Sequence, residues 1–265
     1  MTEDWHAYQL REYNQIEQPD GSTQAGDRYW SVTPAAEQAR ADRARAMLAK
    51  LEALPVAEFS PSARIDAAVF RTLLEEEIGD ARFREWEMPF DSDSDFWSYL
   101  AARRPLDDAE EYRRYIGRMR DLPRFFDEQI ANARAGLKRG FSVPAVTLKG
   151  RDASIAAHVV EDPERSPFWA AFADMPARIP ATEAERLKAV AHKAIAESVV
   201  PSFRKLLSFY RDEYVPGARR TLAAEAMPDG KAYYVQQIRQ YTTLDLSAEE
   251  IHRIGQSEVA RITAE

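Results

Sequence analysis

The sequence predicts an all-α protein built as an irregular array of many helices. Residues that start helices, mainly Ser, Thr and Asp, recur just before runs of helix-forming residues. Behind these starts, apolar residues recur with the spacing of one helix face. Alternation of apolar and polar residues, the mark of a half-buried strand, never extends beyond a few positions. We therefore expect helix in more than about half of the residues, above the usual third.

The first two well-marked helices start at a hydroxyl residue followed by proline. Thr33 can cap a helix that begins with Pro34, because the first helical position needs no N–H group. Its apolar stripe ends before Pro55 and consists of Met47, Leu48, Leu51 and Leu54. Ser60 and Pro61 repeat the start pattern. We expect the buried stripe of this helix to contain Ile65, Val69, Leu73 and, as a further candidate, Ile78.

A polar segment, residues 91–95, separates these helices from the next one, for which Asp107 or Asp108 is the expected cap. We expect Pro123 to break or restart this helix, and Gly136 and Gly140 to close the region. The expected core positions are Tyr112, Tyr115, Ile116, Met119, Phe126, Ile130 and Leu137.

A proline-punctuated connector, residues 163–180, is the best internal boundary. We therefore divide the chain into an N-terminal helical subdomain, 1–162, and a second helical segment, 163–265. Within the connector lie three large aromatic residues, Phe168, Trp169 and Phe172.

The second segment is expected to hold one long helix and a final helix that is cut off. Thr182 and Glu185 match a capping box, and the helix behind them should run to about Tyr214 with a bend near Pro201. A shorter helix follows Asp229 and Gly230. A second capping box, Ser247 with Glu250, starts the final helix, which reaches Glu265 without any stop residue. We expect its end to fray and its apolar face to be exposed.

Composition excludes several classes of function. The net charge of −8 argues against nucleic-acid binding, which favours basic surfaces. The absence of cysteine excludes disulfides and thiolate chemistry. We expect no membrane span, because no apolar run approaches the ~20 residues needed. The start, MTEDWHAYQLREY, lacks the basic and then apolar pattern of a signal peptide. The chain as it stands would be cytoplasmic, but its compartment is left open.

The four histidines do not form a zinc-peptidase motif, because none begins an HExxH pair. Glu3-x-x-His6 and Glu249-x-x-His252 match half of the pattern found in di-iron helical bundles. We favour a simpler interpretation of the second pair: Glu249 lies in a first helical turn, where the helix dipole favours negative charge. The di-iron bundle remains a distant alternative. We assign no catalytic residue, no metal ligand and no cofactor to this chain.

Two further patterns are interpreted as structural. Ser142, in the turn GFSVP, is expected to be a cap rather than a nucleophile, and no GxSxG elbow or phosphate loop occurs. The second pattern is a basic cluster interleaved with acids, expected to be a solvated helix face: Arg113, Arg114, Arg118, Arg120 and Arg124.

The stretch RQYTT is the best candidate for substrate contacts. It places a cation, a phenol and two hydroxyl groups just before a capped helix. Helix caps would explain the threonines alone, whereas substrate contacts would explain the whole group. The candidate substrate-binding residues are Arg239, Tyr241, Thr242 and Thr243.

The same region carries a resemblance to a known family. MPDGKAYYVQQIRQYTTLDLSAEEIHRIGQSEVARI resembles the most characteristic stretch of the bacterial "domain of unknown function 885" family. The upstream segments SARIDAAVFRTLLEEEIGDARFREWEMPF, SPFWAAFADMPARIP and VVPSFRKLLSFYRDEYVPGAR are similar to its early and middle parts, in the same order. Two positions depart from the pattern: Leu244 replaces a third threonine, and Gln256 replaces a leucine. The matching residues are Pro228, Gly230, Tyr234, Arg239, Thr242, Thr243, Glu250, Ile251, His252, Gly255, Glu258, Val259, Arg261 and Ile262.

The resemblance to this family implies a function that the residues alone do not indicate. Members of the family look like mostly helical zinc metallopeptidases, about twice as long as this chain and often exported, with an HExxPGH-like motif in their second half. It therefore implies that this chain is an N-terminal half that forms one wall of a helical cleft for a peptide substrate. Zinc is expected only in the full-length parent, and the expected partners are the C-terminal half or a second copy. The alternative is a stand-alone helical module without catalytic activity.

Overall fold

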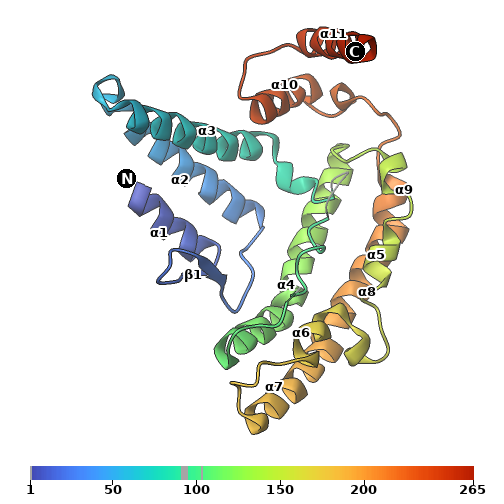
Figure 1. Cartoon of the computed structure of the whole chain (residues 1–265). Coiled ribbons are helices and arrows are strands. Elements are labelled where there is room, and N and C mark those ends of the chain that lie inside the picture. Colours follow the sequence, from blue (N-terminus) through green and yellow to red (C-terminus); the bar gives the residue numbers. More distant parts are fainter. Residues whose placement is uncertain (1, 91–94, 103) are drawn as a thin grey trace. The chain divides into compact units, whose positions relative to one another are not determined.

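The computed structural model describes residues 2–90, 95–102 and 104–265. It confirms the all-α fold: 69% of the chain is helical, and the described strands form only a two-stranded sheet (Figure 1). Of the expected polar segment 91–95, residues 91–94 lie outside the described part. The main elements are α1 (Thr2–Glu12), β1 (Gln15–Glu17), β2 (Thr23–Ala25), α2 (Pro34–Glu52), α3 (Pro61–Phe83), α4 (Ala109–Arg139), α5 (Asp152–Ala156), α6 (Ala170–Ala173), α7 (Ala181–Ala194), α8 (Val200–Phe209), α9 (Val215–Gly217), α10 (Gly230–Thr242) and α11 (Ala248–Ala264).

The chain divides into two compact units, which we describe separately. The first contains Met1–Glu37 and Trp86–Arg220, and the second contains Gln38–Glu85 and Thr221–Glu265. The boundary expected between residues 162 and 163 therefore falls inside the first unit. That segments 1–162 and 163–265 fold independently of each other remains a prediction.

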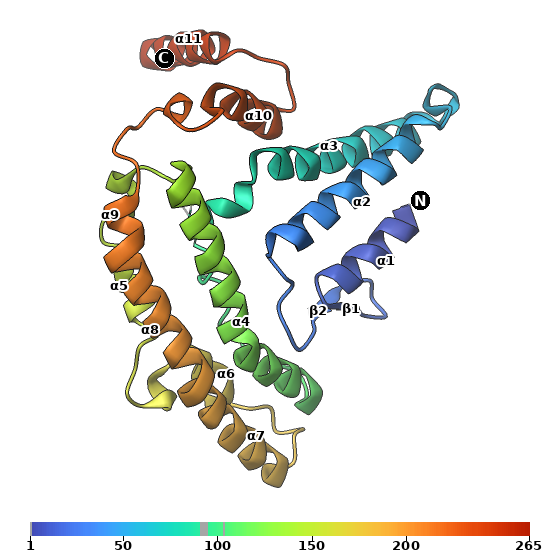
Figure 2. The same cartoon turned by 180° about the vertical axis from the view of Figure 1, so that it is seen from behind.

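The core of the first unit lies between α4 and the helices α7 and α8, which run beside it in both views (Figures 1 and 2). The expected α4 core residues Tyr112, Tyr115, Ile116 and Met119 are all buried. Aromatic residues of the connector also enter this core, since the Tyr112 and Phe172 rings lie 5.0 Å apart.

Asp108 caps α4 by accepting a hydrogen bond from the Glu111 N–H at 2.8 Å, as expected. Gly140, with φ of 78°, closes the helix in the left-handed region that glycine adopts easily. The expected break at Pro123 is wrong, because α4 continues through this residue. Pro123 itself is exposed, whereas Leu122 and Phe126 on either side are fully buried and hold the helix in the core.

The long helix of the first unit runs from α7 through α8 to α9 and contains two π-helical turns, Ile195–Val199 and Tyr210–Tyr214. Each turn lies just before a Val-Pro pair, at Pro201 and Pro216. Because proline has no N–H group, a widened turn lets the helix continue past the lost hydrogen bond. The expected extent of this helix is therefore confirmed.

The expected capping box of Thr182 and Glu185 is wrong. Pro180 is the N-cap, no side chain caps this end, and Thr182 lies inside the first turn of α7. The extended ψ of Pro180, 138°, places its carbonyl group to accept the Ala184 N–H at 2.9 Å. The helix thus begins before the hydroxyl group that was expected to cap it.

The expected starts of α2 and α3 are confirmed. The Ala36 N–H donates to Thr33 Oγ1 at 3.3 Å, and the Ala63 N–H donates to Ser60 Oγ at 3.2 Å. In α2, Met47 and Leu51 are buried as expected, whereas Leu54 lies beyond the helix and is exposed.

The expected buried stripe of α3 is wrong. Ile65, Val69 and Leu73 are more than half exposed, and Ile78 is only partly buried. Phe70 and Leu74, which directly follow Val69 and Leu73 in the sequence, lie on a second apolar face of α3. This second face is the buried one. An aromatic ring removes more apolar area from water than a valine or isoleucine does.

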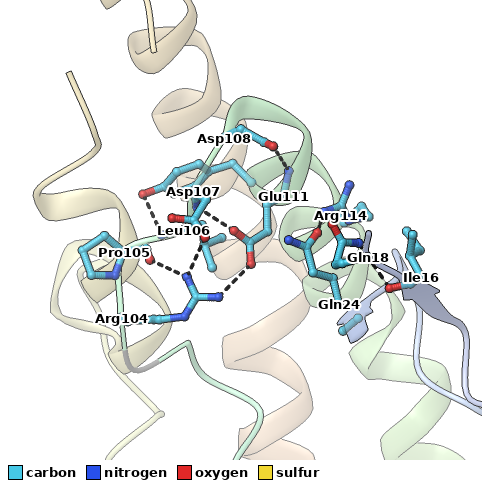
Figure 3. Close-up of polar contacts among 12 residues, drawn as sticks. Ile16, Gln18, Gln24, Arg104, Pro105, Leu106, Asp107, Asp108, Glu111 and Arg114 are labelled. Atoms are coloured by element: carbon cyan, nitrogen blue, oxygen red, sulfur yellow. Dashed lines mark hydrogen bonds and ion pairs between the residues drawn. The ribbon is translucent and has the colours of Figure 1, made fainter. Parts of the chain in front are cut away.

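A short antiparallel hairpin, β1 with β2, was not expected. The turn residues Pro19, Asp20 and Gly21, with Gly21 at φ of 80°, are the pattern that predicts it. The basic cluster on α4 holds this hairpin and is more than a solvated face. Arg114 Nη2 donates to Gln24 Oε1 at 2.5 Å (Figure 3). Arg118 Nη1 donates to the Ala25 carbonyl at 3.1 Å.

In the second unit, α3 packs against α10. The capping box at the start of α11 is confirmed: the Glu250 N–H donates to Ser247 Oγ, and the Ser247 N–H donates to Glu250 Oε2 at 2.8 Å. No residue of α11 is buried, and Ile254, Val259 and Ile262 are exposed.

Candidate functional site

The residues predicted to contact substrate lie at the end of α10, in the second unit. Thr242 Oγ1 donates to the Ile238 carbonyl at 2.7 Å and accepts the Leu244 N–H at 3.1 Å. The Thr243 N–H donates to the Arg239 carbonyl at 2.7 Å. The two threonines therefore close the helix and form the turn toward α11.

Thr243 adopts a backbone conformation that is rare for its residue type. Its φ is 58° and its ψ is 15°, in the left-handed region. A β-branched residue there costs roughly 1–3 kcal/mol, so the conformation persists only where the surroundings hold it. The hydrogen bonds of Thr242 to both sides of the turn supply part of this constraint.

Arg239 lies at a groove between α3 and α10. Its Nη2 donates to Glu75 Oε2 at 3.2 Å, and its Nη1 lies 3.7 Å from Asp245 Oδ1. These carboxylates hold the guanidinium in place while the side chain stays 56% exposed. The groove has a volume of about 140 Å³ and is lined by Thr72, Glu75, Glu76, Gln236, Arg239 and Gln240. Ligand pockets usually have roughly 300–1,000 Å³, so this groove fits one side chain or one chain end rather than a whole peptide.

Tyr241 stands apart from this groove. Its side chain is 84% exposed, and it is not one of the lining residues. Of the four predicted residues, the structure thus places Arg239 in the groove, the two threonines in the adjoining turn and Tyr241 on the open surface.

The sequence prediction missed the other groove residues. Thr72, Glu75 and Glu76 lie on one face of α3, and Gln236 and Gln240 lie one turn apart on α10. Each set repeats at a spacing of three or four residues, which places its members on one helix face. That these two helix faces pack against each other cannot be predicted from a local pattern, because α3 and α10 lie far apart in the sequence.

A buried carboxyl group lies near the end of α3. Burial, contact with Glu85 and the negative charges of Glu85, Glu77 and Glu76 together raise the pKa of Asp80 to about 8, with burial the largest cause. The Tyr233 hydroxyl donates to Glu85 Oε1 at 2.9 Å. The sequence prediction did not include this cluster.

The four histidines are scattered. His6 Nε2 lies 3.2 Å from Glu17 Oε1, His192 lies edge-on to Trp169, and His252 is exposed on α11. His158 stacks on Phe203 with centroids 4.0 Å apart, and burial lowers its pKa to about 4.

No three His, Asp or Glu side chains in the described part of the chain are placed to hold a metal ion. Zinc, which the family resemblance implies, therefore does not fit the described residues. Glu249 lies in the first turn of a capped helix and His252 one turn further in, as expected from the capping box.

A polar cluster at the start of α4 belongs to the scaffold of the first unit (Figure 3). Glu111 is buried, accepts the Asp107 N–H at 2.6 Å and pairs with Arg104 Nη2 at 3.3 Å. Ser142 is also buried: its Oγ accepts the Arg219 N–H at 3.0 Å and donates to the Val143 carbonyl. Both side chains are used in structural contacts.

Comparisons with known proteins identify relatives of the chain. A family model described as "Bacterial protein of unknown function (DUF885)" matches residues 19–265. A solved structure from Colwellia psychrerythraea, whose description calls it a putative lipoprotein, is similar with a TM-score of 0.78 and 17% sequence identity. The match covers 98% of this chain and 46% of that one, so this chain spans less than half the length of the similar structure. No curated protein matches the sequence.

None of the helices in the described ranges is both long and apolar enough to cross a membrane.

Proposed function

Because this chain belongs to the DUF885 family of bacterial proteins of unknown function, we propose that it is the N-terminal part of a zinc metallopeptidase-like protein and forms one wall of its peptide-binding cleft. The observation that carries the proposal is the groove between α3 and α10, with Arg239 fixed at its edge. The greater length of the similar structure supports the idea that further protein completes the cleft.

In this proposal Arg239 binds a carbonyl or carboxylate oxygen of the peptide. A guanidinium presents several N–H donors in a planar fork, a geometry that suits oxygen acceptors. The ion pair with Glu75 and the nearby Asp245 reduce its freedom before the peptide arrives. Thr243 and Tyr241, next to it, are the proposed secondary contacts.

The chemical step is assigned to no residue of this chain. The described part of the chain has no group of side chains placed for zinc, so zinc, its general base and its bound water would have to come from beyond residue 265. The contribution of this chain is to bind and orient the peptide.

We also propose that the complete protein is exported. The description of the similar structure as a putative lipoprotein supports this location. Fractionation of cells that produce the protein, with an antibody against residues 1–265, tests it. Recovery in the cytoplasmic fraction alone would contradict export.

Substitution of Arg239 tests the proposed binding role. In the protein encoded by the complete reading frame, Arg239→Ala should raise KM for a peptide substrate about tenfold and leave kcat within about twofold, because it removes binding without touching the reacting atoms. The matched control is Arg71→Ala on α3. Arg71 Nη1 lies 3.9 Å from Glu75 Oε1, so this variant also removes a cationic partner of Glu75, but Arg71 does not line the groove. Equal KM values for the wild type and Arg239→Ala would refute the role of Arg239. Absence of peptidase activity from the complete protein would favour the stand-alone helical module.

A further inference from the structure

A pocket with a volume of about 440 Å³ lies in the first unit, where the end of α1 meets the segment that follows β2. Sites for small molecules usually have roughly 300–1,000 Å³, so this pocket is large enough for one. Its lining includes Arg11 and Glu12 on α1, Arg28 and Trp30 after β2, and Arg124 and Glu128 on α4. Three arginines against two glutamates give these residues an excess of one positive charge.

The segment after β2 is held firmly on both sides of the pocket. The Tyr29 N–H donates to Asp121 Oδ2 at 2.8 Å, and Arg124 Nη2 donates to the Tyr29 carbonyl at 2.8 Å. The Tyr29 ring is buried. On the side of α1, Asn14 Nδ2 donates to the Arg28 carbonyl at 2.9 Å. The backbone that carries Arg28 is therefore fixed before a ligand arrives, which lowers the cost of binding.

Arg124 and Glu128 are used by the scaffold. Arg124 Nε donates to Asp121 Oδ1 at 2.8 Å, and its Nη1 donates to Glu128 Oε1 at 2.8 Å. Glu128 Oε2 accepts from Ser31 Oγ at 3.0 Å and from the Val32 N–H at 2.8 Å. Because these two side chains bind each other and the neighbouring backbone, they leave little capacity for a ligand.

Arg11 and Arg28 carry the charges that are not used. Among the residues that the structure describes, neither guanidinium group has an ion pair or a hydrogen bond. Arg11 lies in the last turn of α1, where the helix dipole favours a cation, and this accounts for its position without a ligand. Arg28 lies in an irregular segment and has no such explanation. Two unpaired cations in one pocket are a local exception in a chain whose net charge is −8.

We propose that this pocket binds a small organic oxyanion, a carboxylate or a phosphate ester, through the guanidinium groups of Arg11 and Arg28. A guanidinium presents N–H donors in a planar fork that matches the oxygen atoms of both groups. Trp30, whose ring lies edge-on to Phe125 with centroids 5.7 Å apart, supplies an apolar surface for the body of the ligand. The pocket belongs to the first unit, and the proposal does not depend on what the groove of Arg239 binds.

Calorimetric titration of the purified chain 1–265 at low ionic strength tests the proposal. The probes are benzoate, phenyl phosphate and the neutral benzamide, which share one ring and differ in the polar group. At least one of the two anions should bind with a Kd below about 1 mM, and benzamide should bind at least about tenfold more weakly. The anion that binds more tightly identifies the carboxylate or the phosphate as the recognised group. Equal binding of benzamide would refute the proposal.

Substitutions locate the binding. Arg11→Ala and Arg28→Ala should each weaken binding of the anion by about tenfold, because each removes charge-assisted hydrogen bonds. Both side chains are exposed and unpaired, so both variants should keep the melting temperature of the wild type. The matched control is Arg120→Ala, at an exposed position of α4 outside the pocket, which removes the same charge and should change Kd by less than about twofold. Equal weakening in all three variants would show a general effect of charge and refute the site.

Nuclear magnetic resonance of the wild type gives a measurement that does not depend on the arginine variants. The indole N–H signal of Trp30, identified by its loss in Trp30→Phe, should shift when the anion that binds more tightly is added, and stay in place with benzamide. An unshifted Trp30 signal while other signals respond would place the binding elsewhere and refute the proposal. Absence of binding by both anions would refute it as well.

Discussion

Arg239 and Glu75 form an ion pair 3.2 Å long that joins the end of α10 to α3, across 164 positions of the chain. Both side chains are partly exposed, so solvent screens the pair and its contribution to stability is at most about 1 kcal/mol. Its main effect is on geometry, because it fixes the guanidinium at the edge of the groove.

Glu75→Gln should therefore change binding more than folding. The free energy of unfolding should change by less than about 1 kcal/mol, since an exposed pair contributes little. Arg239 would lose one of its two acidic partners, and we expect peptide affinity to fall by about threefold through the lost orientation. Denaturant melts and peptide titrations of the same preparation measure both. A large loss of stability with unchanged peptide affinity would reverse this interpretation.

Gly136 and Gly255 should respond oppositely to alanine. A Cβ at Gly136 would clash with the backbone carbonyl of Glu87, and backbone cannot move aside easily. Gly136→Ala should destabilise the chain by about 1–3 kcal/mol. Gly255, in α11, has open space around its Cβ position, so Gly255→Ala should stabilise that helix by up to about 1 kcal/mol through helix propensity.

Thermal unfolding measures the first effect, and hydrogen exchange of α11 measures the second. A tolerated Gly136→Ala would mean that α4 and the turn at Glu87 lie further apart than the structure shows.

The buried ring of His158 should make the chain less stable in mild acid. Its pKa is lowered by burial from 6.5 to about 4, so the unfolded chain takes up the proton first. Its contribution is complete above about pH 6.5 and is lost as the pH falls toward about 4, with an upper limit of about 3 kcal/mol.

His158→Phe keeps an aromatic ring to stack on Phe203 and removes the titration. Urea melts at several pH values between about 7 and 4 should show a smaller loss of stability in the variant than in the wild type. Parallel curves for the two proteins would show that His158 does not titrate in this way.

The capping box of α11 should act locally. Ser247→Ala removes the acceptor for the Glu250 N–H and should cost about 1 kcal/mol of helix stability. Because no residue of α11 is buried, the cost should appear as faster hydrogen exchange within 248–264 and leave the overall melting temperature unchanged. A clear fall in that temperature would indicate that α11 packs against other parts of the chain.

Local sequence patterns predicted the starts of α2, α3, α4 and α11 because each start depends on one side chain and the backbone beside it. The face of α3 could not be predicted, since Val69 and Phe70 belong to two competing apolar stripes. The same limit applies to the site. Arg239 was found from its own segment, whereas its partner Glu75 depends on how two distant helices pack.

The mass of the native gene product tests the central claim, that this chain is one part of a longer cleft-forming protein. Residues 1–265 have a mass of 30.2 kDa. An antibody against this chain should isolate a protein of roughly twice that mass, with peptides that continue beyond Glu265, in keeping with its coverage of 46% of the similar structure. A native product of 30.2 kDa that ends at Glu265 would contradict the claim and leave a stand-alone helical module.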